Sequence, residues 1–525
     1  MRQHRRTFVK QMSLGMCSIP FFDFSSNHLN PFESSKATIF PRTSPEKQGV
    51  SSTELVNLLK AINNSGIEFH SLMILRHGKI IAEGWWNPFM PEDKHTLYSL
   101  SKSFTSTAIG MAIEEGLLDR ESTVISFFPE FAPATISQNL ASMEIRHLLT
   151  MSTGHDVDTM PALRNATGES WIKTFLNQPV THAPGTHFLY NTGATYLLSA
   201  ILQKKTKQTL VEFLQPRLFE PLGITNYDWE MSPEGINTGG FGLRLTTEDI
   251  AKFGELYLQK GKWQNKQLIS PTWIEEATSA QIKSGSGDND WSQGYGYQFW
   301  RCKPGFYRGD GAFGQFCIVI PQKDTVVAIT SESSDLQKSM SLIWDNLLPA
   351  LKEDTLPENK DNWNQLKNEL KNLSLPVPQG LKKAAIEANI SGKEFKLEDN
   401  SWGIKSVAFN FSPDACTFTV TDANKSYIVK AGLENWIVAD NKRNNAQELF
   451  PMKGRTAIST KIAANAIWKD ENTLQMNWKY TENVHGDKII CVFNNDSVAI
   501  SFINSTAEIA KKTDKWVTLN GKLVS

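Results

Sequence analysis

The chain has 525 residues and a formal net charge of -1, and 40% of its residues are hydrophobic and 21% charged. This balance is ordinary for a soluble globular protein, and the length predicts two or three domains. No dense basic stretch follows the N-terminus and no apolar run is long enough to cross a bilayer, so we expect neither nucleic-acid binding nor a transmembrane span.

The N-terminal segment differs from the rest of the chain. Residues 5–10, RRTFVK, resemble a twin-arginine export signal, in which paired arginines are followed by a phenylalanine and a lysine. We therefore expect residues 1–30 to be an export signal and the protein to be periplasmic or secreted; the alternative is a basic tail without a targeting role. Lipoprotein anchoring at Cys17 is less favoured, because a methionine precedes that cysteine. In an oxidising compartment, a pair such as Cys416 and Cys491 can form a disulfide.

Periodicity divides residues 40–353 into strands, a helical region and strands again. Alternation around a His77-Gly78 turn predicts two strands within residues 70–86. The middle of the segment has mainly helical spacing, and further strands and a closing helix follow it. The predicted helices are residues 143–154, 193–205, 250–261 and 340–352, and the later strands are residues 295–300, 314–321 and 325–330. This order predicts a mixed α/β domain.

The last third of the chain has a different pattern. Residues 354–392 are rich in Pro, Lys, Glu and Asn, which predicts a linker with one polar helix inside it. Beyond it, apolar residues alternate at period two, and Asn- and Asp-rich turns separate the alternating segments. We expect residues 393–525 to fold as an accessory antiparallel β sandwich or barrel without chemistry of its own.

The stretch YSLSKSFTS, residues 98–106, places a lysine three positions after Ser99 at the start of a helical pattern. Residues three apart on a helix share a face, so Lys102 and Ser99 are expected to approach each other. The positive end of the helix dipole favours a serine alkoxide, and burial lowers the pKa of a lysine. A serine beside a neutral amine is an activated nucleophile. By itself, however, S-x-x-K is more often a hydroxyl-rich helix cap followed by a surface lysine, so other motifs must decide.

Two later stretches strengthen the catalytic interpretation. Tyr190-Asn191-Thr192 stands just before a predicted helix, and Gly309-Asp310-Gly311 opens a predicted core strand. These motifs follow S-x-x-K in the order found in serine β-lactamases and penicillin-binding proteins. Over residues 40–350 the chain resembles the class C β-lactamase-related hydrolases, which include esterases, D-amino-acid peptidases and aminohexanoate-dimer hydrolases. The segments that carry the resemblance are YSLSKSFTSTAIG, IRHLLTMSTG, PGTHFLYNTGATYLLSAIL, GGFGLRLTTEDIAKFGELYLQKGKW and GYGYQFW.

The resemblance implies an α/β (α+β) fold of the β-lactamase/DD-peptidase type, with an antiparallel sheet and a helical subdomain, and it assigns roles to the motifs. Ser99 would be the nucleophile and Lys102 its base, and Tyr190 would return the proton to the leaving group. The backbone N–H groups of Ser99 and Ala312 would form the oxyanion hole. Gly311 beside the small Ala312 suits close approach of a substrate to the strand. Neither a metal nor another cofactor is implied.

The chain also departs from the family pattern. Thr192 stands where the family usually has Asn or Ser, although a hydroxyl can still bind a substrate amide. Gly309-Asp310-Gly311 replaces the Lys-Thr-Gly or His-Thr-Gly of β-lactamases, so the cation is missing and an acid occupies the middle position. Asp310 is expected either to recognise an amine or hydroxyl of the substrate or to hold the strand turn, with Arg308 on the same face as its first partner.

Trp86 and Tyr295 are further candidates for substrate binding, as aromatic walls of an acyl pocket. The alternative is that both belong to the core, as aromatic residues at strand ends usually do.

Together these features predict an exported serine hydrolase that cleaves a small ester or amide through an acyl-enzyme on Ser99. Two alternatives stay open: a true β-lactamase or D-Ala-type carboxypeptidase acting on a carboxylate substrate, and a non-catalytic binding protein that uses the same cleft. The missing strand cation disfavours the first, and the joint presence of Ser99, Lys102 and Tyr190 disfavours the second. A small-molecule substrate is expected, and oligomeric state is left without a prediction.

Overall fold

A computed structural model describes residues 40–423, 425–440, 461–511 and 517–524, all within one compact unit of residues 40–525. The predicted export signal, including Cys17, lies outside the described residues.

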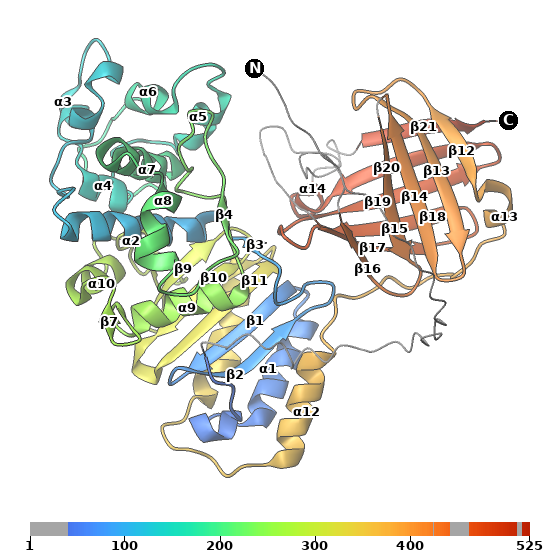
Figure 1. The fold of residues 1–525 in the computed structure, drawn as a ribbon, viewed down its shortest axis with the longest axis horizontal. Helices are drawn as coiled ribbons and strands as arrows, with labels where there is room; N and C mark the ends of the chain where they lie inside the picture. Colours follow the sequence, from blue (N-terminus) through green and yellow to red (C-terminus); the bar gives the residue numbers. More distant parts are fainter. Residues whose placement is uncertain (1–39, 424, 441–460, 512–516, 525) are drawn as a thin grey trace, which may run out of the picture. The chain divides into compact units, whose positions relative to one another are not determined.

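The first part of this unit is built around a six-stranded antiparallel sheet with the order β2-β1-β11-β10-β9-β8 (Figure 1). Its strands are β1 (Glu68–Arg76), β2 (Lys79–Trp85), β8 (Trp300–Arg301), β9 (Tyr307–Gly311), β10 (Gln315–Ile320) and β11 (Thr325–Glu332). The predicted hairpin at His77-Gly78 and the two strands after residue 313 are confirmed. The predicted strand 295–300 is largely wrong, because Gln298 has a φ of 65° and the segment turns back so that Tyr295 pairs with Trp300.

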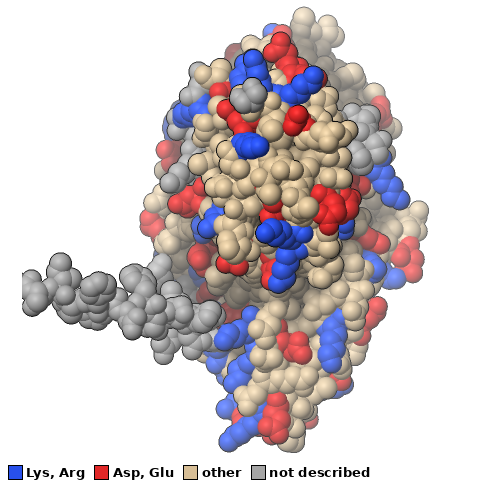
Figure 2. Space-filling model, turned by 90° about the vertical axis from the view of Figure 1, so that its right-hand side faces the viewer, with Lys and Arg blue, Asp and Glu red and all other residues tan. Residues whose placement is uncertain are grey.

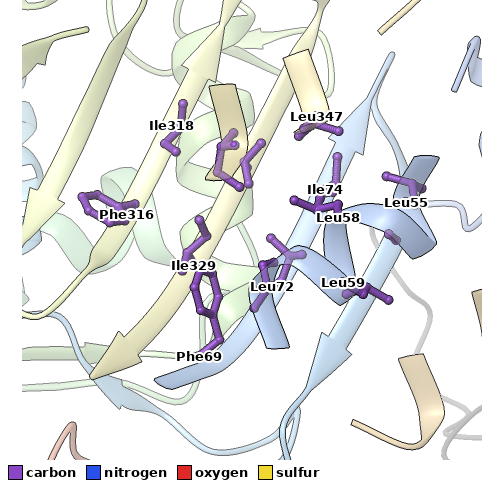
Figure 3. Packing of buried hydrophobic residues seen from close by; sticks show 14 of the residues in the cluster. Leu55, Leu58, Leu59, Phe69, Leu72, Ile74, Phe316, Ile318, Ile329 and Leu347 are labelled. Atoms are coloured by element: carbon purple, nitrogen blue, oxygen red, sulfur yellow. The ribbon is translucent and has the colours of Figure 1, made fainter. Parts of the chain in front are cut away.

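Alternate residues of the sheet face two helical layers. Phe316 and Ile318 on β10, together with Ile74 on β1, pack against α1 (Ser52–Asn64) (Figure 3). Between them, Cys317 points to the other face, where its thiol lies 3.5 Å from the carbonyl of Ile250 on α9 (Thr247–Leu258). A period of two thus places the sheet between α1 and α9.

A helical region lies between β2 and β8 along the chain. In it α2 (Ser101–Glu114) packs on α7 (Thr192–Thr206). Helix α7 confirms the predicted helix 193–205. The predicted helix 143–154 is shorter than expected, because left-handed backbone at Met151 and Gly154, with φ of 57° and 85°, follows its end. The remaining elements of the region are α3 (Gln138–Ala141), α4 (Ile145–Leu149), α5 (Met160–Asn165), α6 (Trp171–Leu176), α8 (Leu210–Leu214), α10 (Pro271–Thr278), β3 (His95–Thr96), β4 (Asp228–Trp229), β5 (Leu243–Leu245), β6 (Lys262–Trp263) and β7 (Lys266–Gln267).

The segment after the closing helix α11 (Leu336–Leu342) continues the core. Residues 354–392, which the sequence predicts as a linker, contain α12 (Lys360–Lys371), and this helix contacts α1 and β2. Leu366 of α12 is fully buried, and a Cβ on Gly84 of β2 would lie 2.5 Å from Leu373 Cδ1. The polar residues of this segment therefore lie mainly on its outer face, while its few leucines pack on the sheet.

The C-terminal part is a closed barrel, one of the two folds expected from the alternating pattern. Strands β12 to β21 form an antiparallel sheet, and a pairing of Gly432 on β15 with Asn465 on β17 closes nine of the described strands into a ring, with β16 outside it. The barrel strands are β12 (Lys393–Leu397), β13 (Ile404–Ser412), β14 (Ala415–Asp422), β15 (Ser426–Gly432), β16 (Ile437–Asp440), β17 (Lys461–Trp468), β18 (Thr473–Lys479), β19 (Gly486–Asn494), β20 (Ser497–Asn504) and β21 (Val517–Leu523). Along the chain, α13 (Glu387–Ile390) precedes β12, and α14 (Ser505–Ile509) stands between β20 and β21. The interior is filled by buried aromatic rings, among them Trp468 and Trp478.

The cysteines considered for a disulfide, Cys416 and Cys491, are both free thiols inside the barrel. Burial raises the pKa of each thiol above its ordinary value, which disfavours the thiolate that disulfide formation requires.

None of the helices in the described ranges has the length and apolarity needed to cross a membrane. On the face shown in Figure 2, Lys and Arg side chains are interspersed with Asp and Glu side chains, so no single sign of charge covers it.

Candidate active site

Ser99 lies in a short 3₁₀ turn, η2 (Tyr98–Leu100), directly before α2. Tyr98 has a φ of 48°, a left-handed conformation that residues other than glycine rarely adopt. The turn is held by the Ser101 hydroxyl, which donates to the Tyr98 carbonyl at 2.6 Å and accepts the N–H of Leu243 at 3.2 Å. While α2 itself is buried, Ser99 stays partly exposed at its start.

Lys102 approaches Ser99 as the spacing predicts. Its Nζ donates to Ser99 Oγ at 3.0 Å, to the Gly240 carbonyl at 2.8 Å and, at the limit of a hydrogen bond, to Thr192 Oγ1 at 3.5 Å. The residue is only 1% exposed. Burial lowers the pKa of Lys102 to about 7, although the charges of Asp158 and Asp310 act in the opposite direction. A large neutral fraction near pH 7 makes this amine able to accept the Ser99 proton.

Tyr190, two residues before α7, completes the group. Its phenol is hydrogen-bonded to Ser99, and Lys102 Nζ lies 4.9 Å from the centre of its ring. Burial raises the pKa of Tyr190 above its ordinary value, the Ser99 hydrogen bond lowers it and the charges of Asp310 and Asp158 raise it further. Tyr190 is thus protonated at neutral pH and can donate a proton to a neighbouring oxygen or nitrogen.

An aromatic wall stands behind Tyr190. Trp300 stacks on the Tyr190 ring with a centroid separation of 5.5 Å, and Tyr295 meets the same ring edge-on at 6.1 Å. Tyr295 and Trp300 also contact each other at 4.7 Å. The structure therefore places Tyr295 against Tyr190, where it is 1% exposed and packs behind the phenol. Trp300, stacked on the same ring, fixes the plane of the phenol.

Strand β9, next to the short edge strand β8, passes close to the Ser99 turn. A Cβ on Gly311 would lie 2.2 Å from the Leu97 carbonyl, so only glycine fits at that position. A Cβ on Gly309 would lie 2.3 Å from Leu100 Cδ1, which would have to move aside. The chain then turns at Ala312, where Gly314 N–H donates to the Gly311 carbonyl at 3.1 Å. This close approach places Ala312 next to the Ser99 turn, where the second oxyanion donor is expected.

Asp310 forms a buried pair with Arg308, the partner expected for it. Arg308 Nε donates to Asp310 Oδ2 at 2.9 Å, and the two side chains are 0% and 6% exposed. Burial raises the pKa of Asp310 above its ordinary value, while Arg308 and the Trp291 side chain lower it. The cation and the anion at this edge of the site thus largely neutralise each other.

One expected site residue lies elsewhere. Trp86 is 3% exposed and belongs to the core cluster beside α1, where its indole donates to Asn63 Oδ1 at 2.9 Å and its ring contacts Phe69. The structure does not bring Trp86 to the Ser99 group. Trp86 follows β2 and lies on the face of the sheet that α1 covers. The prediction for Trp86 is wrong because nothing in the local sequence pattern distinguishes this face from the opposite one.

Asp158 is a residue of the site that sequence reasoning missed. Its Oδ1 accepts the N–H of Thr192 at 2.8 Å, at the start of α7, and the N–H of Met160 at 3.0 Å. It thereby fixes the turn that carries Tyr190 and Thr192, while its charge acts on Lys102. Asn191 caps α7 by accepting the N–H of Gly193. An asparagine directly before a helical pattern is the sequence signal for the start of this helix, where Asp158 binds.

Comparisons with known proteins agree with this geometry. The family model described as Beta-lactamase matches residues 60–352. The chain is 23% identical over 285 residues to a 6-aminohexanoate-dimer hydrolase from Paenarthrobacter ureafaciens, which covers 50% of this chain and 73% of that protein. It is 27% identical over 170 residues to a lovastatin esterase from Penicillium rubens, which covers 28% of this chain and 42% of that protein. A solved structure from Bacillus anthracis, provisionally described as a 6-aminohexanoate-dimer hydrolase, has a TM-score of 0.51 at 20% identity over 61% of this chain and 89% of its own, a likeness of fold.

Proposed function

This chain belongs to the beta-lactamase family and is a serine hydrolase, and we propose that it cleaves a small ester or amide through an acyl-enzyme on Ser99. The observation that carries the proposal is the contact of Lys102 Nζ with Ser99 Oγ at 3.0 Å, combined with a pKa of Lys102 held near neutrality. The named activities of two relatives, hydrolysis of a 6-aminohexanoate dimer and esterase activity on lovastatin, are consistent with this substrate class.

In the proposed acylation step, the neutral amine of Lys102 takes the Ser99 proton as Oγ attacks the substrate carbonyl carbon. The N–H groups of Ser99 and Ala312 stabilise the oxyanion that forms. When the bond to the leaving group breaks, the Tyr190 phenol protonates the departing alcohol or amine and recovers a proton from the Lys102 ammonium. Water then attacks the acyl-enzyme and Lys102 accepts its proton. When the bond between the acyl carbon and Ser99 Oγ breaks, Lys102 returns that proton to Oγ, and a carboxylic acid product leaves with Ser99 and the neutral Lys102 restored.

Labelling with a fluorophosphonate, read by intact mass, tests the nucleophile. Wild type should gain one label and Ser99→Ala none. Ser106→Ala is the matched control, because Ser106 lies on the same helix and its buried hydroxyl has no hydrogen-bond partner among the described residues. Equal labelling of wild type and Ser99→Ala would overturn the assignment, and a wild type that neither labels nor turns over p-nitrophenyl esters would favour the binding-protein alternative.

Neutral substrates are favoured over carboxylates because Arg308, the cation at this edge, is already paired with Asp310. We expect wild type to hydrolyse a short-chain p-nitrophenyl ester more efficiently than nitrocefin, whose carboxylate needs an available cation. Asp310→Thr removes the carboxylate that pairs with Arg308 and leaves its charge uncompensated, so it should shift the ratio towards nitrocefin. Efficient nitrocefin hydrolysis by wild type would instead support the β-lactamase alternative.

Export is a separate proposal, supported only by the twin-arginine pattern at residues 5–10. The expected result is that the protein is found in the periplasmic or secreted fraction and that replacing both Arg5 and Arg6 by lysine retains it inside the cell. An unchanged distribution in that variant would refute a twin-arginine route.

A further inference from the structure

A buried loop of the barrel lies against the Ser99 turn. Residues 480–485, which join β18 to β19, are each less than 9% exposed, whereas connecting loops normally lie on the surface. At the end of this loop, His485 Nε2 is 2.6 Å from the hydroxyl of Tyr98, the residue before Ser99. The His485 ring also meets the ring of Phe313, the residue after Ala312, edge-on at 4.6 Å.

The orientation of His485 is fixed from its other side. His485 Nδ1 is 2.7 Å from Glu332 Oε1, at the end of β11, and Lys479 Nζ is 3.2 Å from Glu332 Oε2. Burial alone would raise the pKa of Glu332, but Lys479 and His485 lower it below its ordinary value, so the carboxylate is ionised and can only accept. His485 Nδ1–H therefore donates to Glu332, and in the neutral imidazole Nε2 accepts the Tyr98 hydroxyl proton.

The two residues that His485 contacts share an unusual backbone. Tyr98 and Phe313 have φ of 48° and 63°, and their rings lie 5.4 Å apart. Each is adjacent to one of the two residues expected to supply the oxyanion N–H groups, Ser99 and Ala312. Left-handed backbone at residues with a side chain persists only where surrounding contacts stabilise it.

We propose that His485 is a positioning residue of the active site, contributed by the C-terminal barrel. By holding Tyr98 and Phe313 together, it sets the separation and direction of the Ser99 and Ala312 amides. The inference rests on the proposed function, since those amides matter only if Ser99 is acylated. It also gives the barrel a part in catalysis although its described residues supply no group to the Ser99–Lys102–Tyr190 constellation.

The experiment compares three variants with one control in the full chain. His485→Ala removes the contact to both rings, Tyr98→Phe removes only the hydroxyl, and His485→Gln keeps one donor and one acceptor. The control, Lys461→Met, breaks the 2.6 Å ion pair of barrel residue Lys461 with Asp93, a pair that includes none of His485, Tyr98 and Phe313. Rates of fluorophosphonate labelling, kcat and KM for a p-nitrophenyl ester, and thermal midpoints are measured for each.

We expect His485→Ala and Tyr98→Phe to lower kcat and the labelling rate by about 10- to 100-fold with KM nearly unchanged, because misplaced amides weaken only the transition state. His485→Gln should recover part of the rate. A double variant that combines His485→Ala with Tyr98→Phe should be no slower than the slower of the two single variants, because both remove the same contact. Lys461→Met should label like wild type even if its midpoint falls.

The outcomes separate this inference from the proposed function. Absence of Ser99 labelling in wild type would defeat the proposed function itself. Labelling of wild type together with control-like rates in His485→Ala and Tyr98→Phe would overturn the positioning role and leave the function standing. Should His485→Ala fail to fold, Tyr98→Phe decides the question, because it keeps the ring contacts and removes a single oxygen.

Discussion

Two lysines of this protein that are largely shielded from solvent have opposite electrostatics. Lys102, at the start of α2, is 1% exposed, and Lys479, at the end of β18, has 13% of its side chain exposed. Burial would lower the pKa of both ammonium groups. The pKa of Lys102 falls to about 7, whereas contacts with Glu68 and Glu332 outweigh burial and raise the pKa of Lys479 above its ordinary value.

The difference lies in the acceptors. Lys102 donates to three uncharged oxygens, and the carboxylates that affect it, Asp158 and Asp310, act as charges through space. Lys479 Nζ touches two carboxylates, Glu68 Oε1 at 2.6 Å and Glu332 Oε2 at 3.2 Å. A carboxylate in contact therefore decides whether a buried lysine is a base near neutral pH or a permanent structural cation.

Removing the catalytic lysine should have the largest effect. Lys102→Ala leaves Ser99 without a base, and we expect kcat to fall by at least about 10³-fold, as for other catalytic bases that act as a unit with their nucleophile. Ser99→Ala with Lys102→Ala should be no slower than Ser99→Ala alone. Steady-state kinetics on a p-nitrophenyl ester provide the measurement, and additive losses would show that the two residues act independently.

Removing the structural lysine should change stability instead. Lys479→Met leaves the buried Glu332 and the partly exposed Glu68 without their cation, and we expect the free energy of unfolding to fall by about 3 kcal/mol. Urea denaturation gives the value. The control is Lys488→Met on the neighbouring strand, whose exposed pair with Glu508 should be worth under about 1 kcal/mol. Similar losses in the two variants would show that the contacts of Lys479 confer no special stability.

Local patterns were enough to place Ser99 just before a helix and to predict the hairpin at His77-Gly78 and the two strands after residue 313, but not the turn at residues 295–300. The contact between Ser99 and Lys102 follows from helix spacing alone, and the one-sided strands of the barrel follow from alternation. Barrel closure depends on the pairing of Gly432 with Asn465, which no local signal encodes. The contact of Tyr98 with His485 joins residues 387 positions apart, so an isolated histidine in the barrel gave no indication of it.

Acid should remove the stabilisation around Lys479. Burial alone would raise the pKa of Glu68, but Lys479 and His70 lower it from 4.5 to about 2. A carboxyl with a depressed folded-state pKa stabilises the fold above its unfolded value, and this contribution is lost as pH falls from about 4.5 towards 2. With 30% of the side chain exposed, the loss should be about 2 kcal/mol at most.

The measurement is the difference in unfolding free energy between wild type and Lys479→Met, near pH 6 and near pH 3. The gap should narrow at the lower pH, because Glu68 in Lys479→Met loses its largest pKa-lowering partner, becomes protonated there and no longer needs a cation. A gap that is constant across this range would place the stabilisation elsewhere.

The smallest effect should come from a charge that acts on Lys102 without touching it. Asp158→Asn removes a negative charge that raises the pKa of Lys102, while its Oδ1 can still accept the N–H groups of Thr192 and Met160. The pKa of Lys102 should therefore fall further, and the acidic limb of the labelling rate against pH, set near 7 in wild type, should move to lower pH. Asp156→Asn, two residues away at an exposed position, is the control and should leave the limb in place. A shift to higher pH in Asp158→Asn would mean that a different group controls the limb, since losing an anion can only make an ammonium harder to keep charged.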